Sequence, residues 1–481
     1  MKRDLALLID FYELTMANSF FELGRHNEIA YFDYFFRSIP DNGGYAIFAG
    51  LEQLIEYIEN LAFSKTELEY LRNQKIFSEE FLSFLNNFKF RGSIYSFKEG
   101  FPIFPGEPIV TVVGPIIDCL LIETALLLTL NHQSLIATKS SRIVESAQGR
   151  AVMEFGARRA HSYDAANFGA RAAYIAGVMG TSNTYLDYKM KIPALGTMAH
   201  SYVQSFDTEY ESFLAYAKTY PNNTLLLVDT YDTIRQGIPN AIKVNEEYLK
   251  LHGSYLKGIR IDSGDLTYLT KKARKMLDEA GLTETKITVS NSLDEYLIRD
   301  LIQQGAQIDS FGVGERLITA KSDPVFGGVY KLVAIEDDQG NIIPKIKISD
   351  NVIKTTTPGF KQVYRFFDKN DKAIADVVTI HDEIIDVNQP YLLFDPDHTW
   401  KQKRVKNYKI EPLLHQIFDK GKLVYQTPSI EEIRQTRAYQ LSRMWDEMKR
   451  LEYPHQYYVD LSKPLWDLKQ KLIKEYSKVD Q

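Results

Sequence analysis

The chain has 481 residues, of which 44% are hydrophobic and 25% are charged, and its formal net charge is −6. This length predicts more than one domain, and the composition is that of a soluble globular protein. The negative charge excludes a general attraction to nucleic acid or to an anionic membrane, although it leaves room for a local basic site that binds a phosphorylated small molecule.

No apolar stretch of the sequence is long enough for a signal peptide or a membrane span. The start, "MKRDLALLIDFYELTM", is interrupted by Asp4 and Asp10, and the run "CLLIETALLLTL" is interrupted by Glu123. We therefore expect a cytoplasmic protein. Cys119 is the only cysteine in the sequence, which excludes an internal disulfide and a cysteine-based metal site, and we expect it to be a buried core thiol.

Residues 1–133 are predicted to form an α+β domain. "GLEQLIEYIENLAF" has apolar residues at helical spacing, and "RGSIYSF" and "EPIVTVVG" are typical of strands bounded by Gly and Pro. A further helical pattern covers residues 119–146. Two residues of this part stand out. Tyr12 lies among apolar helix residues, which core packing would also explain. Arg37 ends an aromatic strand, where a charge at the strand edge would also explain it.

Residues 134–350 alternate between short strands and helices. "AVMEF", "TLLLVD", "GIRID" and "KITVS" are predicted strands, each followed by a helical pattern, and "IDSFGVG" closes the set. This rhythm predicts parallel strands joined by crossover helices, which we interpret as an incomplete or irregular α/β barrel. Because the carboxyl ends of such strands form one face, we expect the polar residues found there to converge. These are Asp229, Asp262, Ser290 and Gly312.

Residues 351–481 form a C-terminal region to which the sequence assigns no chemistry. "KQVYRFF" and "DEIID" are predicted strands, and "IEEIRQTRAYQLSRMWDEMKRL" and "LWDLKQKLIKEYSK" are predicted helices. The basic stretch "KQKRVKNYK" is more typical of a solvated loop or strand edge than of a nucleic-acid site.

The stretch "GIRIDSGDL" gives the strongest local signal for chemistry. Asp262 and Asp265 bracket a Ser-Gly turn at a strand end, where carboxylates can bind ribose hydroxyls or the waters of Mg²⁺. Asp265 is equally well placed to cap the helix that follows. Arg260 is two residues before Asp262, so both side chains point to the same side of the strand.

Glycines and arginines supply further candidates for anion binding. "FGVGERLITAKSDPVFGGVYKL" contains two Gly pairs and a Thr hydroxyl, which suit a phosphate site late in a barrel: Gly312, Gly314, Thr319, Gly327 and Gly328. In "EFGARRAHSYDAA", Arg158 and Arg159 follow a strand, and we expect at least one of them to bind an anion.

His200 lies in "GTMAHSY", one of only nine histidines in the sequence. It is either a buried histidine bonded to a backbone carbonyl or a nucleophile, because a neutral imidazole can attack a phosphate near pH 7. A metal site is disfavoured, because no second His, Cys or carboxylate lies at ligand spacing nearby in the sequence.

Seven motifs in order resemble the nicotinate phosphoribosyltransferase family. They are "DFYELTMA", "YFDYFFRSIP" with "GGYAIFAGLE", "EFGARRAHSYDAA", "GTSNTYL", "GTMAHSYVQSF", "RIDSGDL" and "FGVGERLITAKSDPVFGGVYKLV". The resemblance implies a type II phosphoribosyltransferase barrel. It also implies ATP-dependent synthesis of nicotinate mononucleotide from nicotinate and phosphoribosyl pyrophosphate (PRPP), a step of NAD salvage catalysed by a homodimer with shared active sites.

The resemblance further implies roles around the pyridine ring. Tyr12 from a neighbouring subunit and Phe155 would stack on the ring. Arg158, Arg260 and Thr197 would surround the nicotinate. Ser182 takes the place of an acidic residue that nicotinamide-using relatives carry, and this favours the acid over the amide.

For the other substrates, the resemblance implies that Asp262 holds the ribose or its Mg²⁺, with Asp265 as a weaker metal ligand. Arg37 would reach the pyrophosphate across the dimer, and the glycines and Thr319 would receive the 5-phosphate. His200, flanked by Thr197 and Ser201, resembles the family's phosphorylated histidine.

Two alternatives stay open from the sequence. The chain could be a nicotinamide phosphoribosyltransferase, or a non-catalytic protein that senses a phosphosugar on the same fold.

Overall fold

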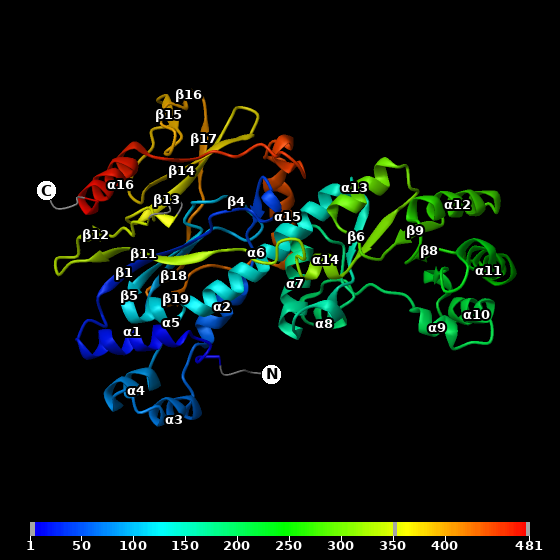
Figure 1. Cartoon of the computed structure of the whole chain (residues 1–481), viewed down its shortest axis with the longest axis horizontal. Coiled ribbons are helices and arrows are strands. Elements are labelled where there is room, and N and C mark those ends of the chain that lie inside the picture. Colours follow the sequence, from blue (N-terminus) through cyan, green and yellow to red (C-terminus); the bar gives the residue numbers. More distant parts are fainter. Residues whose placement is uncertain (1–4, 350–353, 478–481) are drawn as a thin grey trace. The chain divides into compact units, whose positions relative to one another are not determined.

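The structure is a computed structural model that describes residues 5–349 and 354–477 (Figure 1). The chain folds into two compact units: Met1–Leu135 with Val325–Gln481, and Ile136–Pro324. The first unit is therefore discontinuous in sequence, and the second is inserted into it. Within the described residues no helix combines the length and apolarity needed to cross a membrane.

The inserted unit is built on a five-stranded parallel sheet in the order β6-β10-β9-β8-β7. The strands are those predicted: β6 Ala151–Glu154, β7 Leu225–Leu227, β8 Gly258–Ile261, β9 Lys286–Val289 and β10 Ser310–Val313. Its helices are α7 Tyr163–Ile175, α8 Thr184–Met190, α9 His200–Gln204, α10 Glu209–Thr219, α11 Ile238–Val244, α12 Leu266–Glu279, α13 Glu295–Gln303 and α14 Glu315–Ile318. The expected strand–helix alternation, and with it the α/β class, is confirmed.

The sheet does not close into the predicted barrel within the described residues. β6 and β7 are its two edges, and no ladder joins them. Two isolated parallel bridges, Glu154 with Thr181 and Thr181 with Ala194, continue the sheet beyond β6. The segment 191–199 has no regular strand beyond that last bridge, so it offers β7 no partner.

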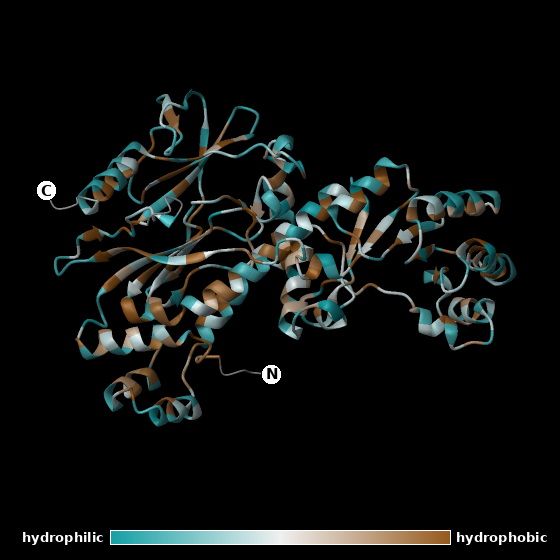
Figure 2. Ribbon diagram, in the orientation of Figure 1, coloured by the Kyte–Doolittle hydropathy of each residue, from teal (hydrophilic) through white to brown (hydrophobic). Residues whose placement is uncertain are grey.

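Continuous apolar strands and amphipathic helices form the core of this unit. Ile259, Ile261, Ile287 and Val289 on β8 and β9 are fully buried, as expected for strands covered on both faces. Burying each such side chain contributes about 1.5–3 kcal/mol. Hydrophobic and hydrophilic residues alternate around the covering helices α12 and α13 (Figure 2).

The discontinuous unit is built on a seven-stranded sheet in the order β12-β11-β1-β5-β3-β18-β19. Its strands are β1 Ile29–Phe35, β3 Ser93–Ser96, β5 Val110–Pro115, β11 Val329–Glu336, β12 Ile342–Pro344, β18 His415–Asp419 and β19 Lys422–Leu423. Strands from both ends of the chain thus share one sheet, and β11, predicted as part of the catalytic domain, pairs with β1. The division into domains 1–133, 134–350 and 351–481 stays a prediction.

Smaller sheets and helices complete this unit. A four-stranded sheet has the order β17-β13-β14-β20, with β13 Lys361–Phe367, β14 Ala373–Ile380, β17 Lys409–Pro412 and β20 Val459–Leu461. The two-stranded sheets are β2 Ala46–Ile47 with β4 Pro102–Ile103, and β15 Tyr391–Phe394 with β16 Gln402–Val405. The helices are α1 Phe11–Glu22, α2 Leu51–Asn60, α3 Lys65–Asn73, α4 Glu79–Asn86, α5 Ile116–Leu121, α15 Ile430–Ser442 and α16 Lys463–Tyr476, and α6 Glu123–Ser146 has residues in both units.

One predicted strand of this region is wrong. The stretch "DEIID" at 382–386 is not a strand, although β14 ends just before it. Asp386 Oδ1 accepts hydrogen bonds from Asn388 N and Nδ2 at 2.9 and 3.2 Å, and Ile384 is 92% exposed. Local turn formation by an Asp-x-Asn sequence therefore outweighs the strand propensity of the two isoleucines.

A buried ion pair joins β1 to β13. Asp33 Oδ2 lies 2.8 Å from Lys361 Nζ, and Thr111 Oγ1 donates to Asp33 Oδ1 over 2.7 Å. Lys361 Nζ also donates to the carbonyl of Thr357 over 2.9 Å. Both charges are thus hydrogen-bonded, as a buried pair requires.

Candidate active site

Four strand ends of the parallel sheet meet at one edge, as predicted. Asp262 N donates to Asp229 Oδ2 over 2.8 Å, and Ser290 Oγ donates to Asp262 Oδ1. A Cβ atom added at Gly312 would lie 3.4 Å from the Cβ of Ser290. The carboxyl ends of β7, β8, β9 and β10 therefore form a continuous edge, the place where parallel α/β sheets bind their ligands.

Asp229 organises the turn that follows β8. Its Oδ2 also accepts from Ser263 Oγ over 2.6 Å, so one oxygen holds both the backbone and a side chain of that turn. Its Oδ1 is buried and has no hydrogen-bond partner among the described residues. A buried carboxylate oxygen without a donor is costly, and this one faces His200 Nε2 at 4.0 Å. The sequence predicted that Asp229 converges with the other strand-end residues at this face, but it assigned Asp229 no role.

His200 is the first residue of α9 and lies against the same edge. Its Nδ1 is 3.1 Å from Thr230 Oγ1, and its Nε2 is 3.8 Å from Asp262 Oδ2. The side chain is 39% exposed. The reading of a buried histidine bonded to a backbone carbonyl is therefore wrong. The fold also brings two carboxylates to His200 that the local sequence could not show, although the described residues contain no cluster of three or more His, Cys, Asp or Glu that could hold a metal.

Arg260, on β8, is directed at the loop that precedes α9. Its Nη1 donates to Thr197 Oγ1 over 3.2 Å and its Nη2 to the Met198 carbonyl over 2.9 Å. Burial lowers the pKa of Arg260, the charge of Asp262 opposes this, and the nearby charge of Arg158 adds to the lowering. Its Nε is buried and has no partner among the described residues. The positive charges of Arg260 and Arg158 thus repel each other at this edge, and a bound anion would stabilise the arrangement.

The end of β6 carries Phe155. Its N–H donates to the Val313 carbonyl over 2.8 Å, and a Cβ at Gly312 would lie 2.5 Å from its ring. Gly312 is therefore required by packing against Phe155, whatever else it contacts. Ser182 is exposed, and its N–H donates to the Glu154 carbonyl over 2.8 Å.

The buried Glu154 side chain links these two segments. It accepts from Gly156 N and from Thr181 Oγ1, the latter over 2.6 Å, and burial raises its pKa. The side chain thereby ties the loop after β6 to the turn that carries Ser182. No signal in the sequence points to this role, because Glu154 lies in an ordinary strand pattern.

Two of the remaining candidates of this unit, Asp265 and Thr319, have hydrogen-bond partners of their own. Asp265 is the N-cap of α12 and accepts from Tyr268 N over 3.0 Å, so the capping alternative is confirmed. Thr319 Oγ1 donates to the Glu315 carbonyl over 2.8 Å, and Arg158 is exposed. A Cβ at Gly314 would lie 3.2 Å from the Phe155 carbonyl oxygen.

Four candidates belong to the discontinuous unit. Tyr12 is 50% exposed on α1, and burial is the largest cause that raises its pKa to about 12. Arg37 has a buried Nε without a partner among the described residues, and its guanidinium lies 5.5 Å from the centre of the Phe35 ring. Gly327 has φ +64° with open space at its Cβ position, whereas a Cβ at Gly328 would collide with Asn131. The core-packing reading does not fit a half-exposed Tyr12.

Comparison with known proteins identifies the family. Three of its sequence models match: the nicotinate phosphoribosyltransferase N-terminal domain over residues 7–131, the family itself over 150–396, and the C-terminal domain over 360–469. A nicotinate phosphoribosyltransferase of Bacillus subtilis is 46% identical over 474 residues, which cover 98% of this chain and 96% of that protein.

The chain belongs to the nicotinate phosphoribosyltransferase family. The human nicotinate phosphoribosyltransferase is 28% identical over 95% of each chain. A crystal structure of the human nicotinic acid phosphoribosyltransferase superposes with a TM-score of 0.86 and covers 97% of this chain and 100% of that one. The resemblance carried by the seven motifs is thus confirmed, and the strand-edge cluster belongs to a nicotinate phosphoribosyltransferase fold.

Proposed function

We propose that the chain is an ATP-dependent ligase that makes nicotinate mononucleotide from nicotinate and PRPP, a step of NAD salvage. Membership of the family supports the two substrates. The observation that carries the proposal is the cluster of Asp229, Asp262, His200 and Arg260 at one sheet edge. It combines carboxylates for a ribose with cationic groups for a carboxylate or pyrophosphate and a histidine for phosphate chemistry.

In the transfer step, the pyridine nitrogen attacks ribose C1. The N–C1 bond forms while the C1–O bond breaks, and its electron pair leaves with pyrophosphate. The sugar forms no covalent bond to the protein, and the serines of this edge, Ser263 and Ser290, would act only by holding Asp229 and Asp262. Asp262 would hold the ribose hydroxyls and stabilise positive charge at C1. Its position is fixed by its backbone bond to Asp229 and its side-chain bond to Ser290.

The nicotinate would lie between two aromatic rings. Phe155 forms one wall, and Tyr12 of a second subunit forms the other, so we also propose a homodimer. Arg260 and Arg158 would attract the carboxylate, and Thr197, held by Arg260, would orient it.

Ser182 leaves a neutral, exposed surface where an acidic side chain would repel the nicotinate carboxylate. This favours the acid over nicotinamide. The non-catalytic sensor is disfavoured, because a protein that only binds a phosphosugar has no need of His200 facing two carboxylates.

For PRPP, we propose that backbone amides near the glycines receive the 5-phosphate, together with Thr319. Gly327 fits best, because its left-handed backbone and open Cβ side suit close approach of a ligand. The packing around Gly312 and Gly328 already explains why both positions are glycine. Only their backbone amides would therefore contribute to the phosphate site. Arg37, with a free buried Nε, would bind the pyrophosphate of a partner's site.

Asp262 is also the residue that would hold Mg²⁺. Mg²⁺ prefers one or two carboxylates together with substrate phosphate oxygens, and Asp262 Oδ2 and Asp229 Oδ1 both lie at the strand edge near His200. The Asp265 carboxylate, which caps α12, fits less well. The ion would supply charge neutralisation for the pyrophosphate.

His200 would couple ATP to the transfer. An imidazole nitrogen attacks the γ-phosphorus, the N–P bond forms, and the P–O bond to ADP breaks with its electrons on ADP. Water later cleaves the N–P bond and releases phosphate. Nε2 is the nitrogen available for this, because Nδ1 bonds Thr230. The added phosphoryl group brings close to two negative charges beside Asp229 and Asp262, and it would draw Mg²⁺ and the arginines around PRPP.

Two broader features belong to the same proposal. We place the reaction in the cytoplasm, and we propose that the single bridges at Thr181 and Ala194 mark the course of an irregular barrel that continues from β6.

The test compares His200→Ala with His252→Ala. His252 is an exposed histidine of the same unit and serves as the control. Product formation is measured with nicotinate or nicotinamide, each with and without ATP. His200→Ala is expected to lose nicotinate-stimulated ATP hydrolysis but retain slow, ATP-independent synthesis. γ-Labelled ATP is expected to leave an acid-labile, base-stable label on wild type and on His252→Ala only. Normal coupling in His200→Ala would exclude the phosphohistidine, and a preference for nicotinamide would exclude the proposed substrate.

A further inference from the structure

The C-terminal part of the discontinuous unit contains a cavity of about 730 Å³ that the proposed function does not use. It is lined by basic residues from two segments, the turn after β13 and the end of β16, and by aromatic residues from the segment after α15. The members used below are Lys369, Lys403, Arg404, Lys406, Trp445 and Tyr458. None of the candidate active-site residues lines it. A volume of this size matches that of small-molecule sites in proteins.

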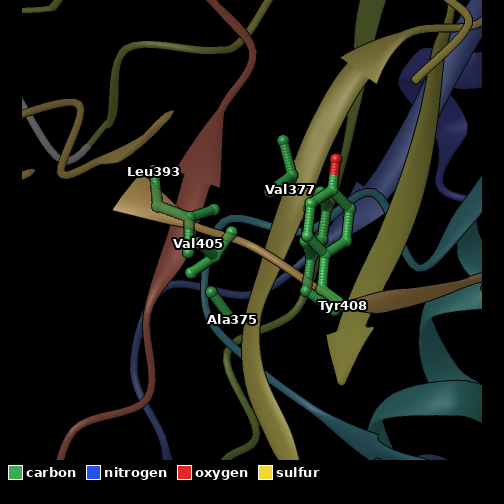
Figure 3. Packing of buried hydrophobic residues seen from close by; sticks show 6 residues of the cluster. Ala375, Val377, Leu393, Val405 and Tyr408 are labelled. Carbon is green, nitrogen blue, oxygen red and sulfur yellow. The ribbon is translucent and has the colours of Figure 1, made fainter. Parts of the chain in front are cut away.

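The basic wall is held in place by a hydrophobic cluster. Val405, at the end of β16, packs with Leu393, Val377, Ala375 and Tyr408 (Figure 3). Since successive side chains of a strand point to opposite faces, the inward direction of Val405 turns its neighbour Arg404 away from this cluster. The basic stretch "KQKRVKNYK" is thus an ordered hairpin segment with a rigid base, as the strand-edge reading predicted.

The positive charges of the cavity are not balanced by acidic partners. Within the described residues, Lys369, Lys403, Arg404 and Lys406 form no ion pair within 4.0 Å. The two acidic residues of the lining are engaged elsewhere. Asp368 Oδ1 accepts from two backbone amides of its own turn at 2.8 and 2.9 Å, and Glu447 lies 3.8 Å from the guanidinium of Arg450. Four cations against two carboxylates leave the lining of this cavity net positive in a chain of net charge −6, which favours an anionic ligand.

The opposite wall offers flat aromatic surfaces. Trp445 is 43% exposed, yet its Nε1 donates to the Ala373 carbonyl over 2.6 Å, which fixes the ring. Tyr458 is 49% exposed and meets the ring of His455 edge-on, with centroids 5.7 Å apart. A fixed, partly exposed indole can stack a planar ring without a large loss of side-chain entropy.

We propose that this cavity is a second ligand site for a nucleotide, with the phosphates on the basic hairpin and the base against Trp445. The basic residues and the aromatic wall together favour a nucleotide. A phosphorylated sugar would not use the aromatic wall, and a neutral aromatic ligand would not use the cations. An extended nucleic acid is disfavoured, because the chain as a whole carries a net charge of −6.

The test uses Trp445 as its own reporter. The chain has three tryptophans, so Trp400→Phe with Trp466→Phe leaves Trp445 alone, and a thermal melt checks that this variant is folded. ADP is expected to quench its fluorescence to saturation. Adenosine is expected to bind at least about tenfold more weakly, and ribose 5-phosphate to compete without quenching. No nicotinate is present, so this result does not depend on the proposed reaction.

Matched charge reversals complete the test. Arg404→Glu with Lys406→Glu should weaken ADP binding at least about tenfold by fluorescence and calorimetry. Lys409→Glu with Lys422→Glu makes the same change in net charge at exposed lysines outside the cavity and should leave binding within about threefold. The proposal is overturned if ADP gives no saturable quenching, if the cavity variant binds like wild type, if both pairs weaken binding equally, or if a single-stranded oligonucleotide displaces ADP at lower concentration than ADP itself binds.

Discussion

Asp229→Ala tests whether one buried carboxylate builds the catalytic turn. The substitution leaves Asp262 N–H and the Ser263 hydroxyl without their acceptor. Each unsatisfied donor costs about 1–3 kcal/mol. Water can reach the partly exposed turn, so we expect a combined cost of about 2–4 kcal/mol for holding Asp262 in its present position. If that position is needed in the transition state, kcat/KM should fall by roughly 30- to 1,000-fold.

Asp229→Asn separates geometry from charge. Its carbonyl oxygen can accept the same two hydrogen bonds, but the negative charge 4.0 Å from His200 Nε2 is lost. We expect ATP-independent synthesis to stay within about threefold of wild type, whereas coupling to ATP hydrolysis falls. The measurements are nicotinate mononucleotide formation with and without ATP, ADP release, and the thermal midpoint of each variant.

Asp232→Ala is the matched control. Asp232 Oδ1 also accepts two backbone hydrogen bonds, at 3.1 and 2.8 Å, but it caps a helical turn instead of the strand-edge turn. It should lower stability with little change in kcat/KM. The reasoning is refuted if Asp229→Ala keeps kcat/KM within about threefold of wild type, or if Asp232→Ala loses as much.

Three further predictions concern selectivity, assembly and pH. Arg260→Ala should lower kcat/KM for nicotinate by roughly 30- to 1,000-fold, and an activity near wild type would exclude its role at the carboxylate. Mixing inactive Tyr12→Ala with inactive Asp262→Asn subunits should restore activity through hybrid dimers, and no recovery after confirmed subunit exchange would place each site within one chain. Burial raises the pKa of Glu13 from 4.5 to about 8, so the folded state holds this proton more tightly than the unfolded state does. Unfolding free energy should therefore fall as pH rises from about 4.5 to about 8, and urea titrations should show a flatter fall for Glu13→Gln but not for the exposed Glu59→Gln.

The strand edge was predictable because its cause is local. Each parallel strand is marked by an apolar run, and the chemistry of a βα unit lies at the strand's carboxyl end. Asp262 and Ser290 could therefore be expected to meet although 28 residues separate them, and they share a hydrogen bond. The capping role of Asp265 followed in the same way from the helix pattern after it.

Contacts between irregular segments were not predictable. His200 meets Thr230 and Asp229 because the loop before α9 folds back onto the end of β7, and no periodicity encodes such a path. The pairing of β1 with β11 was also not predictable. The two antiparallel strands are about 300 residues apart, and the residue pattern of one does not identify the other as its partner. Gly312 and Gly328 could be read as ligand glycines, because sequence does not reveal the Phe155 and Asn131 side chains that exclude a Cβ.

The ion pair of Asp33 with Lys361 has a consequence for synthesis on the ribosome. Asp33 emerges early, but its partner follows only after the whole inserted unit, Ile136–Pro324, has been translated. At about 5–20 residues per second, the delay is on the order of tens of seconds. Burying this carboxyl group without its lysine costs free energy, which disfavours the final packing of β1 in its sheet during this interval. We expect the inserted unit to fold first on the nascent chain. The part of the discontinuous unit that precedes it would fold later, and its apolar strands would remain accessible to chaperones until then.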